Sequence, residues 1–272
     1  MGSVADEVLE KAGLLAAYDD QLRTDAEAIG ASARVRLGPL HLLEFPGERG
    51  FVTYRDLGEG SDEELRARLV EWVPRVLAHF RERGVRRLEW KTRGHDRAPG
   101  LHDLLLAHGF EPAEQESVMV GDARLLALDI ALPAGVTLRR VHEEADVRAA
   151  CRMLDEAFGD PVSERTAEAL LRRLAAGDGT ELWVAEADGR VVCTGRLEPV
   201  PHSDFAGLWG GATLAPWRGR GIYRAVTAAR ARSALALGRT LLHSDSTEYS
   251  RPILERSGMV RVTTTTPYDI GL

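Results

Sequence analysis

Residues 213–226 read Thr-Leu-Ala-Pro-Trp-Arg-Gly-Arg-Gly-Ile-Tyr-Arg-Ala-Val, and this stretch restricts the fold and the function more than any other part of the chain. It joins the apolar segment 208–214 to a long amphipathic helical pattern through a turn that contains Gly219 and Gly221. Glycine lets backbone N–H groups approach a ligand closely, and the first N–H groups of a helix have no intrahelical partner. The stretch therefore predicts an anion-binding turn at a helix N-terminus.

Three arginines, Arg218, Arg220 and Arg224, lie at the same predicted helix start. Positive charge at this end of a helix is disfavoured by about 0.3–1 kcal/mol per residue unless an anion is present. A phosphate is the simplest anion that explains the arrangement.

Two known phosphate-binding patterns fit these residues poorly. A dinucleotide-binding fingerprint is imitated by Gly219-x-Gly221 with Asp245 some two dozen residues further on. However, Arg224 occupies the place of the third glycine, and too little chain follows Asp245 to complete a doubly wound sheet. A Walker loop is excluded because no Gly-Lys-Ser/Thr follows the turn.

Arg218-x-x-Gly221 resembles the pyrophosphate loop of the GNAT acyltransferase superfamily, whose usual pattern is Arg/Gln-x-x-Gly-x-Gly/Ala. Tyr223 stands where the family usually has its last small residue, so a bulky ring must find room there. A second segment, 250–259, resembles the helix and Gly-Phe ending that follow the fifth strand of the family. With the elements around these two motifs, the resemblance covers about half of the chain.

The second segment also has helix signals of its own. Pro252 suits a first helical turn, Arg256 a last turn and Gly258 a left-handed C-terminal cap. The threonine-rich run 260–268 is typical of a strand, and we expect it to close the sheet of the second half.

The second half of the chain has the complete GNAT order of elements. After the spacer 131–135, the patterns predict a strand at 136–140, helices at 143–158 and 163–175, strands at 181–187, 191–198 and 205–214, the long helix, a strand ending near 242, a helix and a last strand.

The first half repeats this order more weakly. Strands are predicted at 34–44, 50–55, 87–91 and 116–121, with helices from Ser61 and over 101–108. Ser61-Asp-Glu-Glu64 is a capping box, and the helix that it opens has one apolar face. The resemblance therefore implies an α/β (α+β) protein of two GNAT-like domains, each a mixed, mostly antiparallel sheet flanked by helices.

The two halves differ at the turn before the long helix. The first half has the acidic segment 56–64 where the second half has Arg218–Gly221. Carboxylates would repel a pyrophosphate at this position. We therefore expect a degenerate domain over 1–125 without a phosphate loop, and a single acyl-CoA-binding domain over 126–272.

The resemblance implies acetyl-CoA, or another acyl-CoA, as cosubstrate, and direct attack on its thioester by an amine. Backbone N–H groups of 212–214 would polarise the thioester carbonyl. The cofactor-binding residues expected are Thr213, Leu214, Arg218, Gly219, Arg220, Gly221, Ile222, Tyr223 and Ser250.

The acceptor amine must lose a proton, and Glu198 is the first candidate for the general base. Antiparallel pairing is expected to place Glu198 near 209–211, although a solvated carboxylate at a strand end fits it equally well. His243 and Asp245 are the second candidates, and Asp245 also suits a turn cap.

A proton donor for the departing thiolate is harder to assign. Leu254 stands where many GNAT enzymes have a tyrosine. Tyr249 or Tyr223 would have to replace it, or the thiolate leaves unassisted. The alternative function is therefore a non-catalytic acyl-CoA-binding or interaction protein on a GNAT scaffold.

Composition restricts the partners. The chain has 272 residues, 44% hydrophobic and 28% charged, and a net charge of −7, which argues against a broad nucleic-acid surface. No apolar run reaches membrane-spanning length and no signal-peptide pattern is present, so a cytoplasmic location is expected. Cys151 and Cys193 lack metal-ligand spacing, and no metal is expected. We expect a small-molecule or peptide amine as acceptor, and a monomer or homodimer.

Overall fold

The chain forms two compact units. The computed structural model describes the backbone of residues 4–272 and the side chains from residue 10 onward. The N-terminal unit comprises Met1–Val118, Asp245–Arg251 and Arg261–Leu272, and the C-terminal unit comprises Met119–Ser244 and Pro252–Val260. Each unit has its own buried apolar core.

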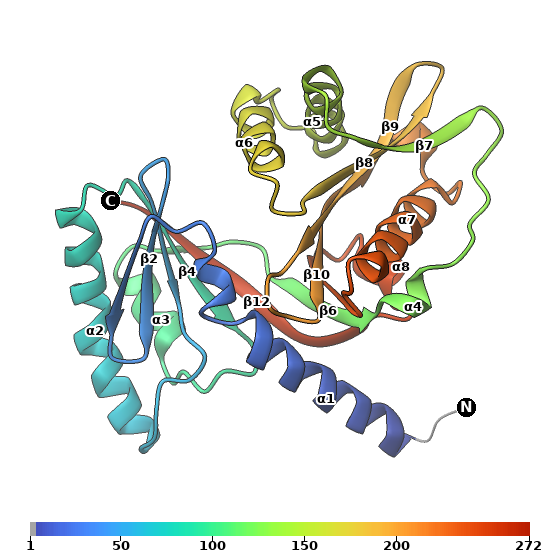
Figure 1. Cartoon of the computed structure of the whole chain (residues 1–272). Helices are drawn as coiled ribbons and strands as arrows, with labels where there is room; N and C mark the ends of the chain where they lie inside the picture. Colours follow the sequence, from blue (N-terminus) through green and yellow to red (C-terminus); the bar gives the residue numbers. More distant parts are fainter. Residues whose placement is uncertain (1–3) are drawn as a thin grey trace. The chain divides into compact units, whose positions relative to one another are not determined.

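The N-terminal unit is a sheet with the strand order β1-β2-β3-β4-β12 (Figure 1). Its elements are α1 (Val4–Leu22), β1 (Ala33–Leu37), β2 (Leu40–Phe45), β3 (Arg49–Thr53), α2 (Asp62–Glu82), β4 (Arg87–Arg93), α3 (Leu101–Ala107), β5 (Glu111–Pro112) and most of β12 (Val260–Gly271). Strands β3 and β4 are parallel, and the pairs β1–β2, β2–β3 and β4–β12 are antiparallel.

Helix α2 begins and packs as its sequence predicts. Ser61 Oγ accepts a hydrogen bond from Glu64 N at 3.2 Å, and Ser61 N donates to Glu64 Oε2 at 2.6 Å, so the capping box is formed. Its apolar face, Leu65, Leu69, Trp72, Val73, Val76 and Phe80, is buried against β2, β3, β4 and α3.

Two features of this unit were not predicted from sequence. Helix α1 lies in a region where the residue pattern gave no element. The single strand expected over 34–44 is two antiparallel strands, because the chain turns at Gly38, whose φ of +58° is in the left-handed region.

The C-terminal unit has the strand order β6-β11-β10-β9-β8-β7. Its elements are β6 (Glu116–Asp122), α4 (Ala123–Leu126), β7 (Val136–Val141), α5 (Glu144–Phe158), α6 (Glu164–Ala175), β8 (Glu181–Ala187), β9 (Arg190–Pro199), β10 (Phe205–Thr213), the 3-10 turn Ala215–Trp217, α7 (Ile222–Ala236), β11 (Leu241–Ser246) and α8 (Arg251–Arg256). Of these, β6 and β11 extend by a few residues, and α8 by Arg251, into the N-terminal unit.

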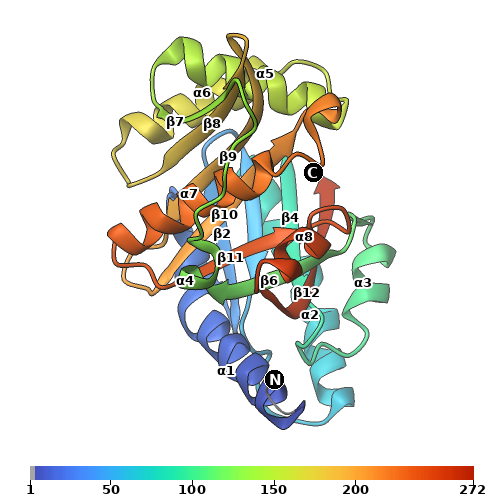
Figure 2. The same cartoon turned by 90° about the vertical axis from the view of Figure 1, so that its right-hand side faces the viewer.

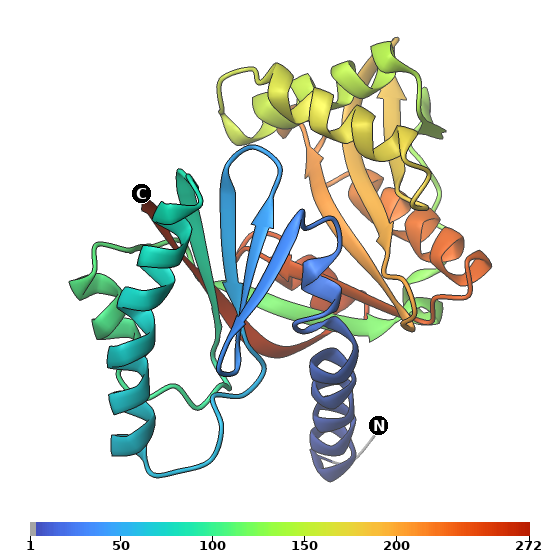
Figure 3. The same cartoon turned by 60° about the vertical axis from the view of Figure 1, so that its left-hand side comes forward.

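The helices of this unit cover both faces of its sheet. Helix α7 lies over β9 and β10 (Figure 2), and α5 and α6 lie on the opposite face (Figure 3). Buried alanines of α7 pack against Leu197, Leu208 and Leu242, whereas α5 and α6 pack against Leu182 and Val184 of β8. The helices and strands predicted over 136–242 are confirmed, with ends that differ by a few residues.

The last strand corrects one expectation. Residues 260–268 do form a strand, but β12 does not close the sheet of its own half. It pairs antiparallel with β4, from Thr265 opposite Arg93 to Gly271 opposite Arg87, and so belongs to the N-terminal unit. A strand pattern shows that a strand exists and not which edge it joins. The division at residues 125 and 126 remains a prediction about the two sequence halves.

The two halves repeat one order of elements. Residues 33–122 contain three antiparallel strands, a helix, a strand parallel to the third, a short helix and a strand. Residues 181–271 contain the same order, with β10 and β11 as the parallel pair. This repetition supports the duplication that the sequence suggested.

Candidate active site

The turn before α7 has the backbone that its glycines predict. Gly219 has φ +74°, and Gly221, the N-cap residue of α7, has φ +80°. A Cβ on either glycine would meet nothing within 4 Å, so the turn borders open space. Side chains are disfavoured here by the backbone conformation itself.

The same turn presents a row of backbone donors. Among residues 4–272, the structure records no acceptor for the N–H groups from Gly219 to Arg224, and the first bonded one is Ala225 N, which donates to Gly221 O at 3.0 Å. No side chain caps this helix start. Unbonded N–H groups at the positive end of a helix suit an anion such as a diphosphate.

Two of the predicted arginines hold the turn. Arg218 Nε donates to Thr213 O at 2.9 Å, and Arg218 Nη2 donates to Ala157 O at 3.3 Å. The Arg220 guanidinium lies 4.9 Å from the ring centre of Trp217, a cation–π contact. The backbone therefore forms the cradle, and these side chains brace it.

The bulky Tyr223 ring has room because the residue of β10 that faces it is Gly211, which has no side chain. A Cβ on Gly211 would come within 2.8 Å of the Tyr223 ring. The ring is half-buried and packs against the apolar core. Tyr223 thus points toward the sheet, and its backbone stays available to the cradle.

Strands β10 and β11 form a fork in front of the cradle. Their parallel pairing runs from Phe205 opposite Leu241 to Gly207 opposite His243, and the register recorded between these two strands in the described residues ends there, although β10 continues to Thr213. The register of β10 with β9 also shifts between Trp209 and Ala212. A fork of this kind frees the polar backbone of β10, which a pantetheine arm can pair with.

Glu198 and His243 lie on either side of β10, at the last paired position before the fork. Gly207 is in register with Glu198 on β9 and with His243 on β11, so both side chains lie on one face of the sheet. A Cβ on Gly207 would overlap the Trp209 indole nitrogen and lie 3.1 Å from His243 Nε2. Glycine at this position therefore lets Trp209 and His243 meet above the strand.

The position of Glu198 differs from the expectation. Its partner is Gly207, whereas Trp209 is paired with Arg196. Glu198 Oε2 accepts from Arg173 Nη1 at 2.6 Å, and Oε1 accepts from Arg196 Nε at 3.1 Å. Both carboxylate oxygens are thus bonded to guanidinium groups, and the base role of Glu198 stays a prediction.

Two other predicted residues belong to the N-terminal unit. Asp245 Oδ2 lies 2.6 Å from Lys91 Nζ, with side chains 7% and 18% exposed. Burial would lower the pKa of Lys91, but the Asp245 carboxylate together with Tyr18 and Glu27 raises this pKa overall. Ser250 Oγ donates to Thr247 O at 3.3 Å. The ion pair with Lys91 gives Asp245 a structural role. The predicted roles of Asp245 as a base and of Ser250 in cofactor binding remain predictions.

The environments of Leu254, Tyr249 and the two cysteines give no sign of a catalytic role. Leu254 is 1% exposed in the core and Tyr249 is 89% exposed. Cys151 and Cys193 are free thiols and buried. The residue patterns gave no reason to single out Arg196, Arg230 or Gly207, because single arginines and glycines are common and only strand register brings these together.

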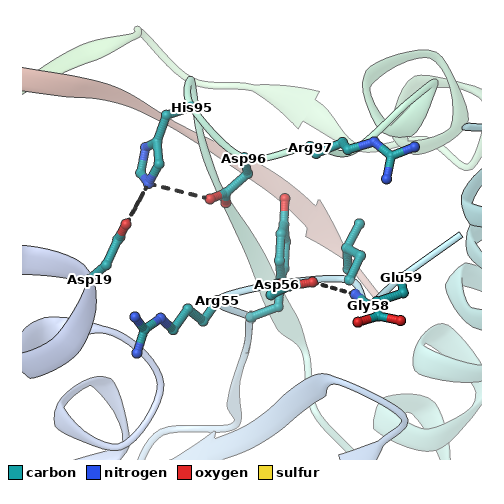
Figure 4. Close-up of a pocket in the computed structure, with 10 residues that line it drawn as sticks. Asp19, Arg55, Asp56, Gly58, Glu59, His95, Asp96 and Arg97 are labelled. Carbon is teal, nitrogen blue, oxygen red and sulfur yellow. Dashed lines mark hydrogen bonds and ion pairs between the residues drawn. The ribbon is translucent and has the colours of Figure 1, made fainter. Parts of the chain in front are cut away.

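The N-terminal unit has a cavity of about 450 Å³ where β3 leads into α2, the place that the cradle occupies in the other half (Figure 4). Its lining residues are Asp19, Tyr54, Arg55, Asp56, Leu57, Gly58, Glu59, His95, Asp96 and Arg97. Arg55 and Arg97 are paired with Asp20 and Asp62 outside the lining set.

The carboxylates of this cavity are partly fixed by one buried arginine. Arg23 donates to Asp19 at 3.0 Å and to Asp96 at 2.9 Å, and His95 Nε2 lies 3.0 Å from Asp19. Burial raises the pKa of Asp96. Burial would raise the pKa of Asp19 too, but His95 and Arg23 lower it overall. Four carboxylates in the lining suit a diphosphate poorly.

The comparisons with known proteins concern the fold. No protein-family model matches the sequence, and no curated protein matches it. Among solved structures, a GCN5-related N-acetyltransferase from Kribbella flavida is similar over 95% of each chain, with 19% identity and a TM-score of 0.67.

Two further structures extend the comparison. A tandem GNAT protein from the clavulanic acid biosynthesis pathway is similar over 100% of this chain and 97% of its own, with 13% identity and a TM-score of 0.62. A GCN5-related N-acetyltransferase from Sphaerobacter thermophilus is similar over 86% of this chain and 76% of its own, with 19% identity and a TM-score of 0.58.

The protein therefore has the fold of the GNAT N-acetyltransferases, with a mixed sheet flanked by helices in each unit. The likeness to the tandem GNAT protein extends over the whole chain. In the described part of the chain, no helix is long and apolar enough to cross a bilayer. No cluster of three or more His, Cys, Asp or Glu side chains suited to a metal ion is found among the residues described.

Proposed function

We propose that this protein transfers an acyl group, normally acetyl, from acyl-CoA to an amine acceptor by direct attack, and that the C-terminal unit carries the reaction. The observation that carries the proposal is the pairing of an unbonded row of N–H groups, Gly219 to Arg224, with the β10–β11 fork. The GNAT fold supports it.

Donor binding rests mainly on backbone groups. The N–H groups of the cradle would bind the diphosphate of CoA, with the positive end of α7 behind them. The β10 backbone from the shifted register to Thr213 would pair with the pantetheine arm. The thioester would then lie beside the fork, where N–H groups can stabilise negative charge on its carbonyl oxygen.

The chemical step needs one proton acceptor and one proton donor. The acceptor nitrogen attacks the thioester carbon, the N–C bond forms, and the C–S bond breaks. We assign the base to His243, directly or through water, because it stands at the fork and the Glu198 oxygens are bonded to two arginines. The thiolate takes its proton from Tyr223, whose ring lies against Gly211, or from water.

Catalysis is tested by free-thiol release from acetyl-CoA with a panel of amines, amino acids and peptides. His243→Gln should lower kcat by about 10²-fold or more, with acetyl-CoA affinity nearly unchanged. His142→Gln is the matched control, since His142 is exposed and its Nε2 lies 3.1 Å from a carboxylate oxygen of its neighbour Glu143.

Glu198→Gln separates the two base assignments. It should raise the KM of the acceptor more than it lowers kcat, because it removes the anion that holds Arg173 and Arg196. A 10²-fold loss of kcat in Glu198→Gln alone would restore Glu198 as the base. Acetyl-CoA binding without thiol release for any acceptor would favour the alternative, a non-catalytic acyl-CoA-binding protein.

A further inference from the structure

Arg196 presents unused hydrogen-bond donors beside the fork. It lies on β9 in register with Trp209, and its side chain is 26% exposed. Its Nε donates to Glu198 Oε1 at 3.1 Å. Within the described residues, no acceptor is recorded for Nη1 or Nη2. Two parallel N–H donors of a guanidinium therefore remain for a ligand.

The guanidinium of Arg196 is held against the bulge of β10. A Cβ on Gly210 would lie 3.1 Å from Arg196 Nη1 and 3.7 Å from Leu154 Cδ2 of α5. Gly210 has φ +55°, so a side chain is disfavoured there by the backbone as well. The absence of a side chain at Gly210 lets Arg196 reach the segment where we place the thioester.

The surrounding charges leave this region positive. Arg173 shares Glu198 with Arg196 and also bonds Asp178 at 3.1 Å. Arg230 is 1% exposed, and its Nη1 donates to the carbonyl oxygen of Arg196 at 3.0 Å. The described residues give Arg230 no carboxylate partner. A buried arginine without a counter-ion raises the electrostatic potential of the strand in front of it.

We infer that the acceptor is an amine that carries a carboxylate, as an amino acid does, and that Arg196 Nη1 and Nη2 bind this carboxylate. The inference rests on the proposed function, because that function places the acceptor amine beside β10. Two parallel guanidinium donors match the two oxygens of a carboxylate. An acceptor without an anionic group would leave the positive charge uncompensated and bind more weakly.

The test measures binding, so that it does not depend on turnover. The CoA-loaded full-length protein is titrated calorimetrically with a panel of N-acetyl amino acids and with the primary amide of each. The acids should bind about 10- to 100-fold more tightly than their amides, the range expected for hydrogen bonds to a charged group. Arg196→Gln should remove this preference, and Arg196→Lys should retain part of it.

Arg190→Gln is the control on the same strand. Arg190 is 61% exposed and bonded to Glu156, so its loss should leave the preference intact. Equal affinity of acids and amides in the wild type overturns the inference, as does a preference that persists in Arg196→Gln. Tighter binding of N-acetyl-O-phosphoethanolamine than of any acid would assign the site to phosphate and overturn it too. If the wild type binds acids more tightly than amides but releases no thiol from acetyl-CoA with any acceptor, the proposed transferase activity is refuted and the carboxylate site is not.

Discussion

At the scale of single residues, the account depends on two glycines with left-handed backbone at the start of α7. Gly221→Asp should abolish acetyl-CoA binding, because it adds a side chain and a negative charge where the diphosphate needs close approach. Arg218→Ala should weaken binding less, since the backbone donors survive. Isothermal titration with acetyl-CoA measures both effects.

Gly238 offers a matched control for this substitution. It follows the other end of α7, has φ +74° and, like Gly221, has nothing within 4 Å of an added Cβ. Gly238→Asp should cost comparable backbone strain and leave the affinity for acetyl-CoA unchanged. Equal loss in both variants would show that the cradle is not the binding site.

The buried thiol of Cys193 gives a prediction on pH. Burial raises the pKa of Cys193 from 9.0 to about 11, and Thr213 Oγ1 lies 3.1 Å from its sulfur. The folded state therefore holds this proton more tightly than the unfolded state. Its contribution to the free energy of unfolding is complete below about pH 9 and is lost as the pH rises toward 11.

The comparison of wild type with Cys193→Ala isolates this contribution. The stability advantage of the wild type over the variant should shrink by on the order of 1–3 kcal/mol between pH 8 and 11. Urea unfolding at several pH values measures it. An advantage that stays constant with pH would mean that the thiol titrates normally in the folded protein.

At the scale of elements, the capping box of α2 is a local signal that the structure confirms. Ser61→Ala should lower the free energy of unfolding by about 0.5–2 kcal/mol, because it removes the acceptor for Glu64 N. Ser163→Ala is the control, since Ser163 is the N-cap residue of α6 and its side chain makes no cap hydrogen bond. An equal loss in both variants, measured by urea unfolding, would contradict a specific role of the box.

Local sequence patterns predicted where helices and strands lie better than they predicted which residues contact one another. The helix and strand order of 136–242 followed from apolar periodicity, glycine turns and caps, which are properties of short segments. The pairing of Asp245 with Lys91 joins residues far apart in sequence, and no local pattern contains it. Likewise, Glu198 was expected near 209–211 and is in register with Gly207, because the exact register of two strands is set by how the turn between them closes and not by a local pattern.

The backbone conformation of the turn before α7 could be predicted from sequence, whereas the surroundings of the base candidates Glu198 and His243 could not. A turn with Gly219 and Gly221 has a conformation that sequence specifies directly. A general base is defined by which side chains surround it, and that depends on the register of three strands. His243 gains its place at the fork from Gly207, a residue that carries no side chain and gave no signal.

At the scale of the whole molecule, the two halves share an order of elements but not a chemistry. The place before α7 offers unbonded N–H groups, and the place before α2 is a cavity lined with Asp19, Asp56, Glu59 and Asp96. The last strand of the chain also joins the first half, since β12 pairs with β4. The central claim is therefore one acyl-CoA site per chain, in the C-terminal unit.

The stoichiometry of acetyl-CoA binding tests this claim most directly. Calorimetric titration of the full chain should give one acetyl-CoA per chain, and the same affinity and stoichiometry after Glu59 and Asp62 are both replaced by alanine. Gly221→Asp should then leave no binding at all. A stoichiometry near two, or a loss of binding on changing Glu59 and Asp62, would contradict the account by showing that the acidic segment 56–64 is part of an acyl-CoA site.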